Sequence, residues 1–360
     1  MNSKMKSEES WVQSDMKYNT FTLSDLATIK YGKNQKKVVS DSGSIPIYGT
    51  GGLMGYATEA LYDKPSVLIG RKGTIEKVRY VTHPFWTVDT LFYTMVNEKL
   101  VCPHYLYYLM SLIDLKQFNE GTTIPSLRTE TLNRIEFNIP ELAVQDQILA
   151  MIEPIEERIE LNNEINKNLE QQAQAIYSRM FIEHRQESWS TGQLSDLISV
   201  KYGKDHKKLA DGNYPVYGSG GIMRYIEKPL YTGESVLIPR KGTLNNVVYV
   251  NEAFWSVDTM FYTVMLRPNI AKFVYHFVKS KDLASLNAGS AVPSMTTNIL
   301  NAMQLYIPDE KTLEKFENIV SPMYSAMQEN TKESKILANT RDTLLPKLMS
   351  GELDVSDIDI

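Results

Sequence analysis

The residues best suited to bind a ligand occur twice in this chain, in the same order and at nearly constant spacing. The basic turn RKGT occupies residues 71–74 and returns unchanged at residues 240–243. Arginine can form paired hydrogen bonds with guanine or phosphate, lysine supplies a point charge, and glycine allows close approach of the backbone. A solvated hairpin tip is the alternative, but identical residues in two copies favour a shared ligand. The candidate contacts are Arg71, Lys72, Thr74, Arg240, Lys241 and Thr243.

A second basic cluster precedes each of these turns. The segments KYGKNQKK (residues 30–37) and KYGKDHKK (residues 201–208) each place four lysines around a tyrosine. Such a cluster suits contacts with a phosphate backbone, and a solvated face explains it equally well. The candidate binding residues here are Tyr31, Lys33, Lys36, Lys37, Tyr202, Lys204, Lys207 and Lys208.

No catalytic group recurs in both copies. The glycine segments YGTGG (residues 48–52) and YGSGG (residues 217–221) lack the Lys-Ser/Thr of a P-loop and the third glycine of a dinucleotide motif, so we predict tight turns. Asp89 and Asp258 have no recurring carboxylate or histidine partner, which favours a turn or capping role. The five histidines neither recur nor show metal-ligand spacing. The sequence therefore predicts neither a catalytic constellation nor a metal site.

A duplicated unit carries all these residues. The segment FWTVDTLFYT (residues 85–94) returns as FWSVDTMFYT (residues 254–263), a shift of 169 positions. Short β-branched and aromatic runs predict strands, and residues 104–118 and 272–283 have helical spacing. Each unit is therefore predicted to be a strand-rich domain of about 120 residues. Two such domains suit a two-fold target, of which duplex DNA is the commonest.

Two long helices with matching heptad seams follow the two units. Both seams are apolar at their ends and polar in the middle, where Asn162 and Asn166 correspond to Asn330 and Ser334. A polar layer restricts the register of a coiled coil, so we expect the helices to pack on each other in antiparallel fashion. The alternative is that each helix lies on its own domain. The predicted fold class is α/β (mixed α+β), with two homologous strand-rich domains joined by an antiparallel coiled coil in pseudo-two-fold symmetry.

Prolines and changes of pattern define the expected boundaries. Pro154 and Pro322 correspond, and they predict a kink or break near the start of each helix. The predicted segments are a first domain at 1–141, a central helix at 142–186, a second domain at 187–308, a distal helix at 309–350 and a tail at 351–360.

The net charge of -5 is unevenly distributed. Lysine and arginine exceed aspartate and glutamate by 16 to 15 and by 12 to 9 in the two domains, but are outnumbered 4 to 8 in residues 142–186 and 6 to 11 in residues 309–360. Acidic helices do not forbid phosphate binding by the domains, because counterion release depends on the local surface. The single cysteine, Cys102, is expected to be a small packed residue, and without a signal peptide or an apolar run of about 18 residues we expect a cytoplasmic protein with no membrane partner.

The order of these motifs resembles the specificity subunit of type I restriction-modification systems, from about Phe21 to Val355. The resemblance rests on the LSDL, YGSGG-type, RKGT and FWxxDTxFY motifs, on a GxxxPSL-type loop before each helix, and on the ending RDTLLPKLMSGELDV. It implies a non-catalytic DNA-recognition subunit that binds a bipartite target in double-stranded DNA, with one half-site for each target-recognition domain.

The same resemblance implies the partners. The two helices would dock two modification subunits, which bind S-adenosylmethionine and methylate adenine at N6. Restriction subunits would add ATP- and Mg-dependent translocation and cleavage in the full complex. No cofactor is then expected on this chain itself.

The two domains are alike enough that their half-sites are expected to share part of their sequence, read in opposite orientation. Specificity should then reside where exposed positions differ between the copies. Three arginines at such positions join the candidate DNA-binding residues: Arg79, whose counterpart is Val248, Arg128, whose counterpart is Thr296, and Arg224, whose counterpart is Gly55. The other such differences are Asn34 and Gln35 against Asp205 and His206, and Glu76 and Lys77 against Asn245 and Asn246.

Three other interpretations compete with this one. A self-contained methyltransferase or nuclease needs a cofactor loop and a catalytic dyad that the sequence does not supply. A protein-binding adaptor would explain the acidic helices but not the repeated basic turns. An antirestriction or phase-variable alternate subunit of the same family cannot be separated from the leading interpretation by sequence.

Overall fold

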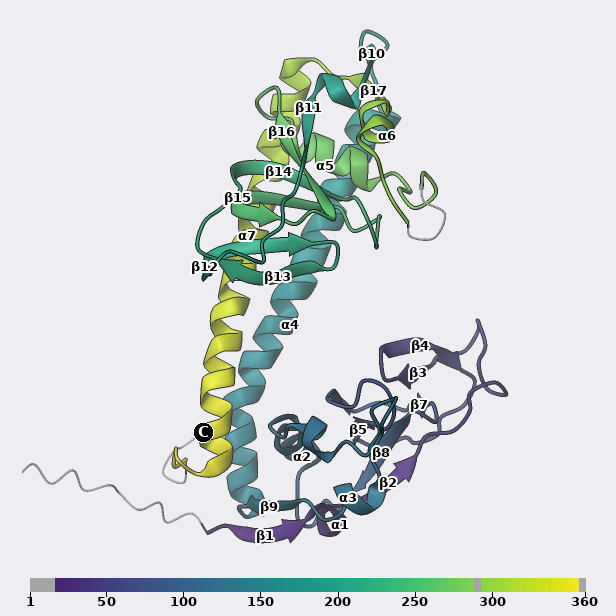
Figure 1. The fold of residues 1–360 in the computed structure, drawn as a ribbon, viewed down its shortest axis with the longest axis vertical. Helices are drawn as coiled ribbons and strands as arrows, with labels where there is room; N and C mark the ends of the chain where they lie inside the picture. The colour runs from purple at the N-terminus through teal and green to yellow at the C-terminus, as the bar shows by residue number, and fades with distance from the viewer. Residues whose placement is uncertain (1–16, 288–292, 356–360) are drawn as a thin grey trace, which may run out of the picture. The chain divides into compact units, whose positions relative to one another are not determined.

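The computed structural model describes residues 17–287 and 293–355, and the chain divides into two compact units (Figure 1). Unit 1 comprises residues 1–161 and 333–360, and unit 2 comprises residues 162–332. Part of the second GxxxPSL-type loop, residues 288–292, and the end of the predicted tail, residues 356–360, lie outside the described residues.

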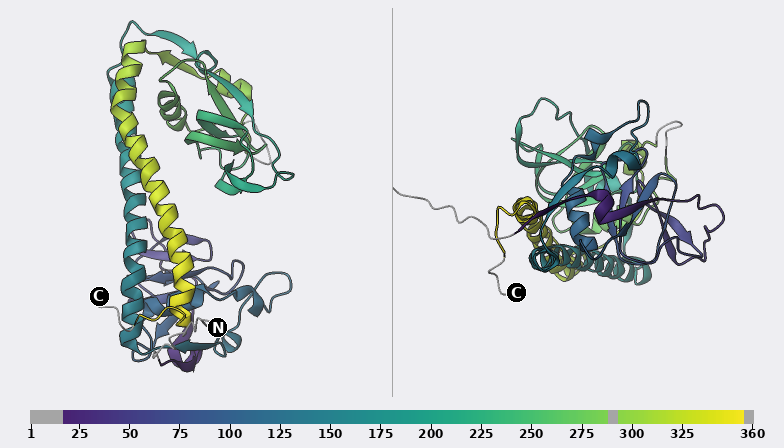
Figure 2. Two further views of the ribbon diagram at one scale, coloured as in Figure 1. Left: turned by 90° about the vertical axis from the view of Figure 1, so that its left-hand side faces the viewer. Right: turned by 90° about the horizontal axis from the view of Figure 1, so that it is seen from below.

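Each unit combines one strand-rich domain with one segment of each long helix. Helices α4 (Leu142–Ser178) and α7 (Glu310–Ser350) both continue from one unit into the other. Within each unit the two helical segments lie side by side (Figure 1, Figure 2). The mixed α/β architecture with two strand-rich domains and long helices confirms the predicted fold class.

Unit 1 contains a four-stranded antiparallel sheet of order β2-β8-β5-β6, a three-stranded sheet of order β4-β3-β7, and the pair β1-β9. Its strands are β1 (Asn19–Thr22), β2 (Ala27–Tyr31), β3 (Ile45–Gly49), β4 (Gly52–Ala57), β5 (Ser66–Gly70), β6 (Val78–Val81), β7 (Trp86–Thr87), β8 (Leu91–Val96) and β9 (Glu136–Ile139). Its short helices are α1 (Leu23–Leu26), α2 (Pro103–Ser111), the 3₁₀ helix η1 (Leu115–Phe118) and α3 (Thr129–Leu132).

Unit 2 repeats this order of elements with one six-stranded sheet, β11-β16-β14-β15-β12-β13, and the pair β10-β17. Its strands are β10 (Ser190–Gln193), β11 (Ile198–Tyr202), β12 (Asp211–Gly218), β13 (Gly221–Ile226), β14 (Tyr231–Pro239), β15 (Val248–Ser256), β16 (Met260–Met265) and β17 (Gln304–Ile307). Its short helices are the π-helix η2 (Arg179–Glu183), the 3₁₀ helix η3 (Leu194–Asp196), α5 (Ala271–Lys279) and α6 (Thr297–Asn301).

Two prolines explain why the sheet is divided in unit 1 and continuous in unit 2. Strand β15 covers the positions that β6 and β7 occupy in unit 1. Pro84 stands where unit 2 has Ala253, and Pro65 stands where it has Glu234. Both unit 2 residues belong to the β14–β15 ladder. Proline has no N–H group to donate, so the ladder in unit 1 is interrupted.

The helix segments close the apolar core of each unit. In unit 1 the core joins the inner face of β5 and β8 with α2, with Ile148 and Ile152 of α4, and with Leu345 and Leu348 of α7. In unit 2 the corresponding core joins β14 and β16 with α5 and with both helices. Each domain therefore needs a segment of both helices to bury its apolar surface, because burial of that surface is the main favourable contribution to folding.

The predicted heptad seam agrees with the burial of the helices. Every predicted seam residue of α4 from Ile152 to Ile176 is buried or half-buried, and so is every one of α7 from Val320 to Leu348. In unit 2, the Asn330 amide donates to the Asn166 side-chain oxygen at 2.9 Å, and the Asn162 amide lies 3.4 Å from the Asn330 carbonyl. These contacts confirm antiparallel packing of the helix segments around the polar layer.

In unit 1 the same helices meet through charged groups, and the prolines do not interrupt them. Arg158 of α4 forms a paired ion contact with Glu333 of α7 at 2.9 Å, and the neighbouring Ser334 is half-buried on the seam. Both helices run without a break through Pro154 and Pro322. Both prolines lie on the exposed side of their helices, so the backbone loses hydrogen bonds there while the apolar seam persists.

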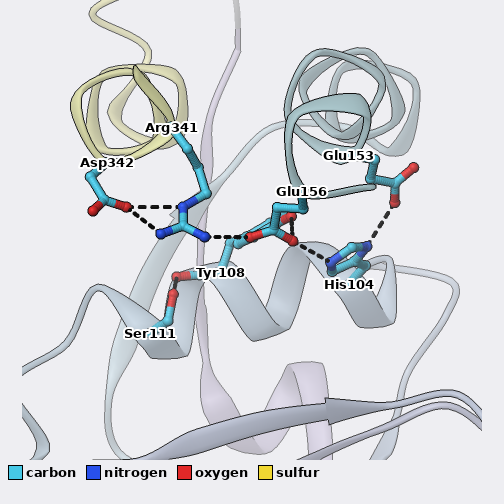
Figure 3. Close-up of polar contacts among 7 residues, drawn as sticks. All are labelled: His104, Tyr108, Ser111, Glu153, Glu156, Arg341 and Asp342. Carbon is cyan, nitrogen blue, oxygen red and sulfur yellow. Dashed lines mark hydrogen bonds and ion pairs between the residues drawn. The ribbon is translucent and has the colours of Figure 1, made fainter. Parts of the chain in front are cut away.

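A polar cluster fixes the domain of unit 1 to its helices (Figure 3). His104 of α2 contacts Glu153 of α4 at 2.7 Å, and the Tyr108 hydroxyl donates to Glu156 at 2.7 Å. Arg341 of α7 approaches the other oxygen of Glu156 at 3.3 Å. The two α2 side chains bind carboxylates of α4, and Glu156 also binds Arg341 of α7. Because these directional contacts leave α2 little freedom to rotate, the cluster sets the orientation of the sheet that packs against α2.

Unit 2 uses a different cluster at the same place. The Nδ1 atom of His276 on α5 lies 2.8 Å from the Gln174 side-chain oxygen, and its Nε2 atom lies 2.9 Å from the Tyr324 hydroxyl. A neutral imidazole satisfies both partners, donating to Gln174 and accepting from Tyr324. Burial lowers the pKa of His276 to about 4; the Glu170 carboxylate partly offsets this shift and Lys279 adds to it.

This histidine predicts acid sensitivity of unit 2. As the pH falls from 6.5 towards about 4, the unfolded chain takes up a proton at His276 that the folded chain does not. The unfolding free energy should therefore fall by on the order of 3 kcal/mol over this range. Replacing His276 with glutamine keeps a polar side chain without titration, so H276Q should lose clearly less stability. Urea unfolding from pH 7 to pH 4 measures both proteins, and identical pH slopes would contradict the assignment.

Candidate nucleic-acid interface

The strand register gathers three candidate segments at one end of the sheet in unit 1. Tyr31 at the end of β2 pairs with Phe92 of β8, and Gly70 at the end of β5 pairs with Leu91. The lysine cluster follows β2, the RKGT turn follows β5, and the Asp89–Thr90 turn precedes β8. Because β2 and β5 both run antiparallel to β8, all three segments lie at the same end of the sheet. In unit 2 the same register is made by Tyr202 with Phe261 and by Pro239 with Met260.

The FW-x-V-D-T segment ties two of the loops together. In unit 1 the Trp86 indole donates to the Lys33 carbonyl at 2.9 Å, and the Val88 N–H donates to the Tyr48 carbonyl at 3.0 Å. The segment thereby holds both the lysine loop and the glycine hairpin. The same bonds recur in unit 2, from Trp255 to Lys204 at 2.8 Å and from Val257 to Tyr217 at 3.1 Å.

The RKGT segment is a fixed loop rather than a solvated hairpin tip. The Arg71 N–H donates to the Thr90 carbonyl at 2.8 Å, and the Gly73 N–H donates to the Pro125 carbonyl at 2.9 Å. The Arg71 carbonyl accepts from Leu127 at 2.9 Å, so the loop is bound to the GxxxPSL-type segment. Gly73 has a φ of +87°, and its counterpart in unit 2 has +88°, which is the left-handed region that favours glycine.

An arginine stacks on an exposed tyrosine in each unit. The Arg71 guanidinium lies 5.0 Å from the centre of the Tyr31 ring and donates to the Asp89 carbonyl at 2.9 Å. Arg240 repeats this arrangement over Tyr202 at 5.3 Å, with a bond to the Asp258 carbonyl at 3.1 Å. The tyrosines are 50% and 52% exposed. A guanidinium oriented on one face in this way keeps N–H groups available for a ligand.

The remaining predicted contacts surround this pair. Most of them are exposed lysines: Lys33, Lys36, Lys37, Lys72, Lys204, Lys207, Lys208 and Lys241. Thr243 is exposed and Thr74 is half-buried. The Asn34 and Asp205 side chains each accept the N–H of the second residue beyond them, Lys36 and Lys207, so both hold the lysine turn in shape. Asn34 and Asp205 differ in the sequence but make the same hydrogen bond in their loops.

The clearest chemical difference between the units surrounds a shared tyrosine. In unit 1 the Arg79 guanidinium lies 5.2 Å from the Tyr48 ring, and the Tyr48 hydroxyl lies 3.1 Å from His83. In unit 2 the corresponding Tyr217 hydroxyl donates to Glu252 at 2.7 Å, and Val248 replaces Arg79. Burial and the Glu252 carboxylate raise the pKa of Tyr217. One unit therefore presents cationic and imidazole groups where the other presents a carboxylate.

Two predicted arginines contact their own domain. Arg128 is exposed and forms an ion pair with Glu120 at 3.0 Å. Arg224 is half-buried, pairs with Asp211 at 2.8 Å and donates to the Leu209 carbonyl at 2.9 Å. The seam asparagines and Ser334 lie on the helices, away from these loops. The assignment of Arg128, Arg224 and the tyrosine, lysine, threonine and arginine residues of the loops to DNA contacts stays a prediction.

Two residues beside the loops, His83 in unit 1 and Glu252 in unit 2, are not among the residues predicted from the sequence. They occupy the same repeat position, and this difference between the copies is a signal that the sequence contains. The adjacent apolar residues Leu53 and Met54 on β4 are both exposed. Neighbouring side chains on a regular strand point to opposite faces, so one of the two would ordinarily be buried.

Over residues 17–287 and 293–355, no group of His, Cys, Asp or Glu side chains is arranged to hold a metal ion. No helix in those ranges combines the length and apolarity required to cross a bilayer. Burial, assisted by a hydrogen bond to Asp146, raises the pKa of the Cys102 thiol to about 12. The thiol is therefore protonated at neutral pH and is a poor nucleophile.

Comparison with known proteins agrees with the duplicated architecture. A family model described as "Type I restriction modification DNA specificity domain" matches residues 15–171 and 186–338. The chain is 20% identical over 345 residues to the type I restriction enzyme MjaIX specificity subunit of Methanocaldococcus jannaschii, covering 83% of this chain and 80% of that one. It is 29% identical over 111 residues to the HindI specificity subunit of Haemophilus influenzae, covering 29% of this chain and 24% of that one.

A solved structure shares the fold. The crystal structure of a type I restriction-modification S subunit from M. genitalium superposes with a TM-score of 0.62 at 18% identity, covering 94% of this chain and 97% of that one.

Gly32 should be essential for the packing of the lysine loop. A Cβ atom at Gly32 would lie 2.0 Å from the Val88 carbonyl oxygen and 2.7 Å from that of Thr87, and backbone atoms cannot yield cheaply. We expect Gly32→Ala to lower the unfolding free energy by about 2–3 kcal/mol in urea titrations. Gly51→Ala is the matched control, because a Cβ there meets nothing within 4 Å. Equal stability of the two variants would contradict the packing described for this loop.

Proposed function

The chain belongs to the type I restriction modification DNA specificity domain family, and on this basis we propose that it selects the DNA target of a type I restriction-modification complex. Each unit binds one half of a bipartite duplex target. The chain itself performs no chemistry. The observation that carries this proposal is the pair of arginine–tyrosine platforms, each set among basic loops at the end of its sheet.

The loops offer both kinds of contact that sequence-specific binding needs. Exposed lysines beside Tyr31 and Tyr202 neutralise phosphates and position the domain on the duplex. The oriented guanidinium groups of Arg71 and Arg240 can reach base edges, where bidentate contacts with guanine discriminate between bases. Since both elements recur, the two domains share part of their recognition chemistry. The exchange of Arg79 and His83 for Val248 and Glu252 lets the half-sites differ.

The long helices are proposed to separate the two readers and to dock two adenine-N6 methyltransferase subunits. A helix of 37 residues such as α4 is about 55 Å long, more than one turn of duplex DNA. S-adenosylmethionine, ATP and Mg would bind the partner subunits rather than this chain.

Exchanging the proposed DNA-binding part of the domain between units tests the proposal. Residues 34–101 and 119–128 of unit 1 are replaced by residues 205–270 and 287–296, while α2 stays in place to preserve its contacts with Glu153 and Glu156. With two similar readers, the methylated sequence should become more nearly palindromic. Methylome sequencing of cells that express the chimaera with its modification subunits measures the outcome.

The reciprocal exchange is the control for this experiment. Grafting unit 1 loops into unit 2 should give a palindrome built from the other half-site. If both chimaeras assemble and methylate DNA but keep the original sequence, the loops do not read the target and the proposal fails.

The lysines following Tyr31 should contribute affinity without sequence preference. Replacing Lys36 and Lys37 with glutamine should weaken binding to specific and random duplexes alike, and should reduce the slope of log affinity against log salt by about 1 per lysine. Lys99→Gln is the control, because Lys99 is exposed beyond the opposite end of β8. Fluorescence anisotropy at several salt concentrations measures the slopes. A changed sequence preference would instead assign these lysines to the bases.

A further inference from the structure

Each unit exposes two adjacent apolar side chains at the tip of its glycine hairpin. Leu53 and Met54 on β4 are 54% and 60% exposed, and Ile222 and Met223 on β13 are 49% and 61% exposed. Large apolar side chains exposed singly are ordinary, but the same adjacent pair in both copies of a repeat calls for a shared cause.

A β-bulge produces this exposure. In the β3–β4 hairpin Ile47 pairs with Gly55 and Tyr48 pairs with Leu53, so Met54 is an extra residue without a partner across the ladder. The β12–β13 hairpin has the same shift at Met223. Both β4 and β13 are the terminal strands of their sheets. A bulge in an edge strand redirects side chains, and such bulges often lie beside functional sites.

A glycine next to the turn leaves the space that each methionine side chain occupies. A Cβ atom at Gly49 would lie 2.3 Å from the Met54 sulfur, and one at Gly218 would lie 2.6 Å from the Met223 sulfur. The methionines thus occupy the space above a glycine in the same way in both units. The fold therefore sets the orientation of both methionine side chains.

The hairpin tips lie against the basic loops. A Cβ at Gly73 of the RKGT turn would be 4.0 Å from the Thr50 hydroxyl, and one at Gly242 would be 3.1 Å from the Ser219 hydroxyl. In unit 1 the Arg79 guanidinium also reaches within 3.4 Å of a Cβ placed at Gly52. The apolar pairs therefore stand beside the groups proposed to contact DNA.

We propose that Leu53 with Met54, and Ile222 with Met223, enter the groove of bound DNA and make apolar contacts with the bases. This inference rests on the proposed function. The cations around the hairpins select a polyanion, and the major groove admits a two-stranded β-ribbon. The apolar surfaces that bases offer are the thymine methyl group and the faces of the stack, and both can accept such side chains.

The test compares specific with random DNA. In the complex with the modification subunits, the double variant Leu53→Ser, Met54→Gln should bind the mapped target about tenfold more weakly, with unchanged affinity for a random duplex and an unchanged salt slope. Met95→Gln is the matched control, because Met95 is 41% exposed at the opposite end of β8. Its affinity for both duplexes should equal that of the wild type.

Two modified duplexes distinguish the contacts. If the methyl group is touched, uracil in place of thymine in one half-site weakens binding by the wild type but not by the double variant. If the base faces are touched, 2-aminopurine in that half-site brightens with the wild type only. A variant that binds the target as tightly as the wild type, or loses specific and random affinity equally, overturns the inference, and so does weaker binding with neither effect.

Failure of the proposed function has a separate outcome. In that case the wild-type complex itself shows no preference for the mapped sequence over random DNA. Preference in the wild type together with an unaffected variant removes only the role of the hairpin.

Discussion

The bonds made by the FW-x-V-D-T segment are the constraint on which both proposed DNA-binding surfaces depend. The Trp86 indole, the Val88 N–H and the Thr90 carbonyl hold loops that lie far apart in the sequence. Most of these bonds engage main-chain atoms of the loops, so they do not depend on which side chains the loops carry. A rigid support of this kind lets exposed residues change while their positions stay the same.

The two units share some of these exposed residues and differ in others. Their arginine–tyrosine platforms agree in contact and distance, whereas the surroundings of Tyr48 and Tyr217 differ in charge. A cation or imidazole beside a tyrosine and a carboxylate beside a tyrosine favour different hydrogen-bonding partners on a base. Each proposed DNA-binding surface therefore combines shared with divergent chemistry, as the proposed pair of related but unequal half-sites would require.

The helices contribute to the domains more than a connection. Each domain completes its core with a segment of both helices, and the polar clusters at His104 and His276 use unlike partners for the same task. Tyr108 faces Glu156 in unit 1, while at the corresponding positions His276 faces Tyr324 in unit 2. Each domain is thus matched to its own helix segments, because exchange would leave buried polar groups without suitable partners.

The sequence alone determined the duplication, the tight glycine turns, the strands around RKGT and the heptad seam with its asparagine layer. These follow from local periodicity and turn chemistry, which neighbouring residues carry. Only the tertiary structure decided that Arg224 is bound to Asp211, that Pro65 and Pro84 divide one sheet, and that bulges expose Met54 and Met223. These outcomes depend on partners brought together by strand register, and register is set by the packing of the whole domain.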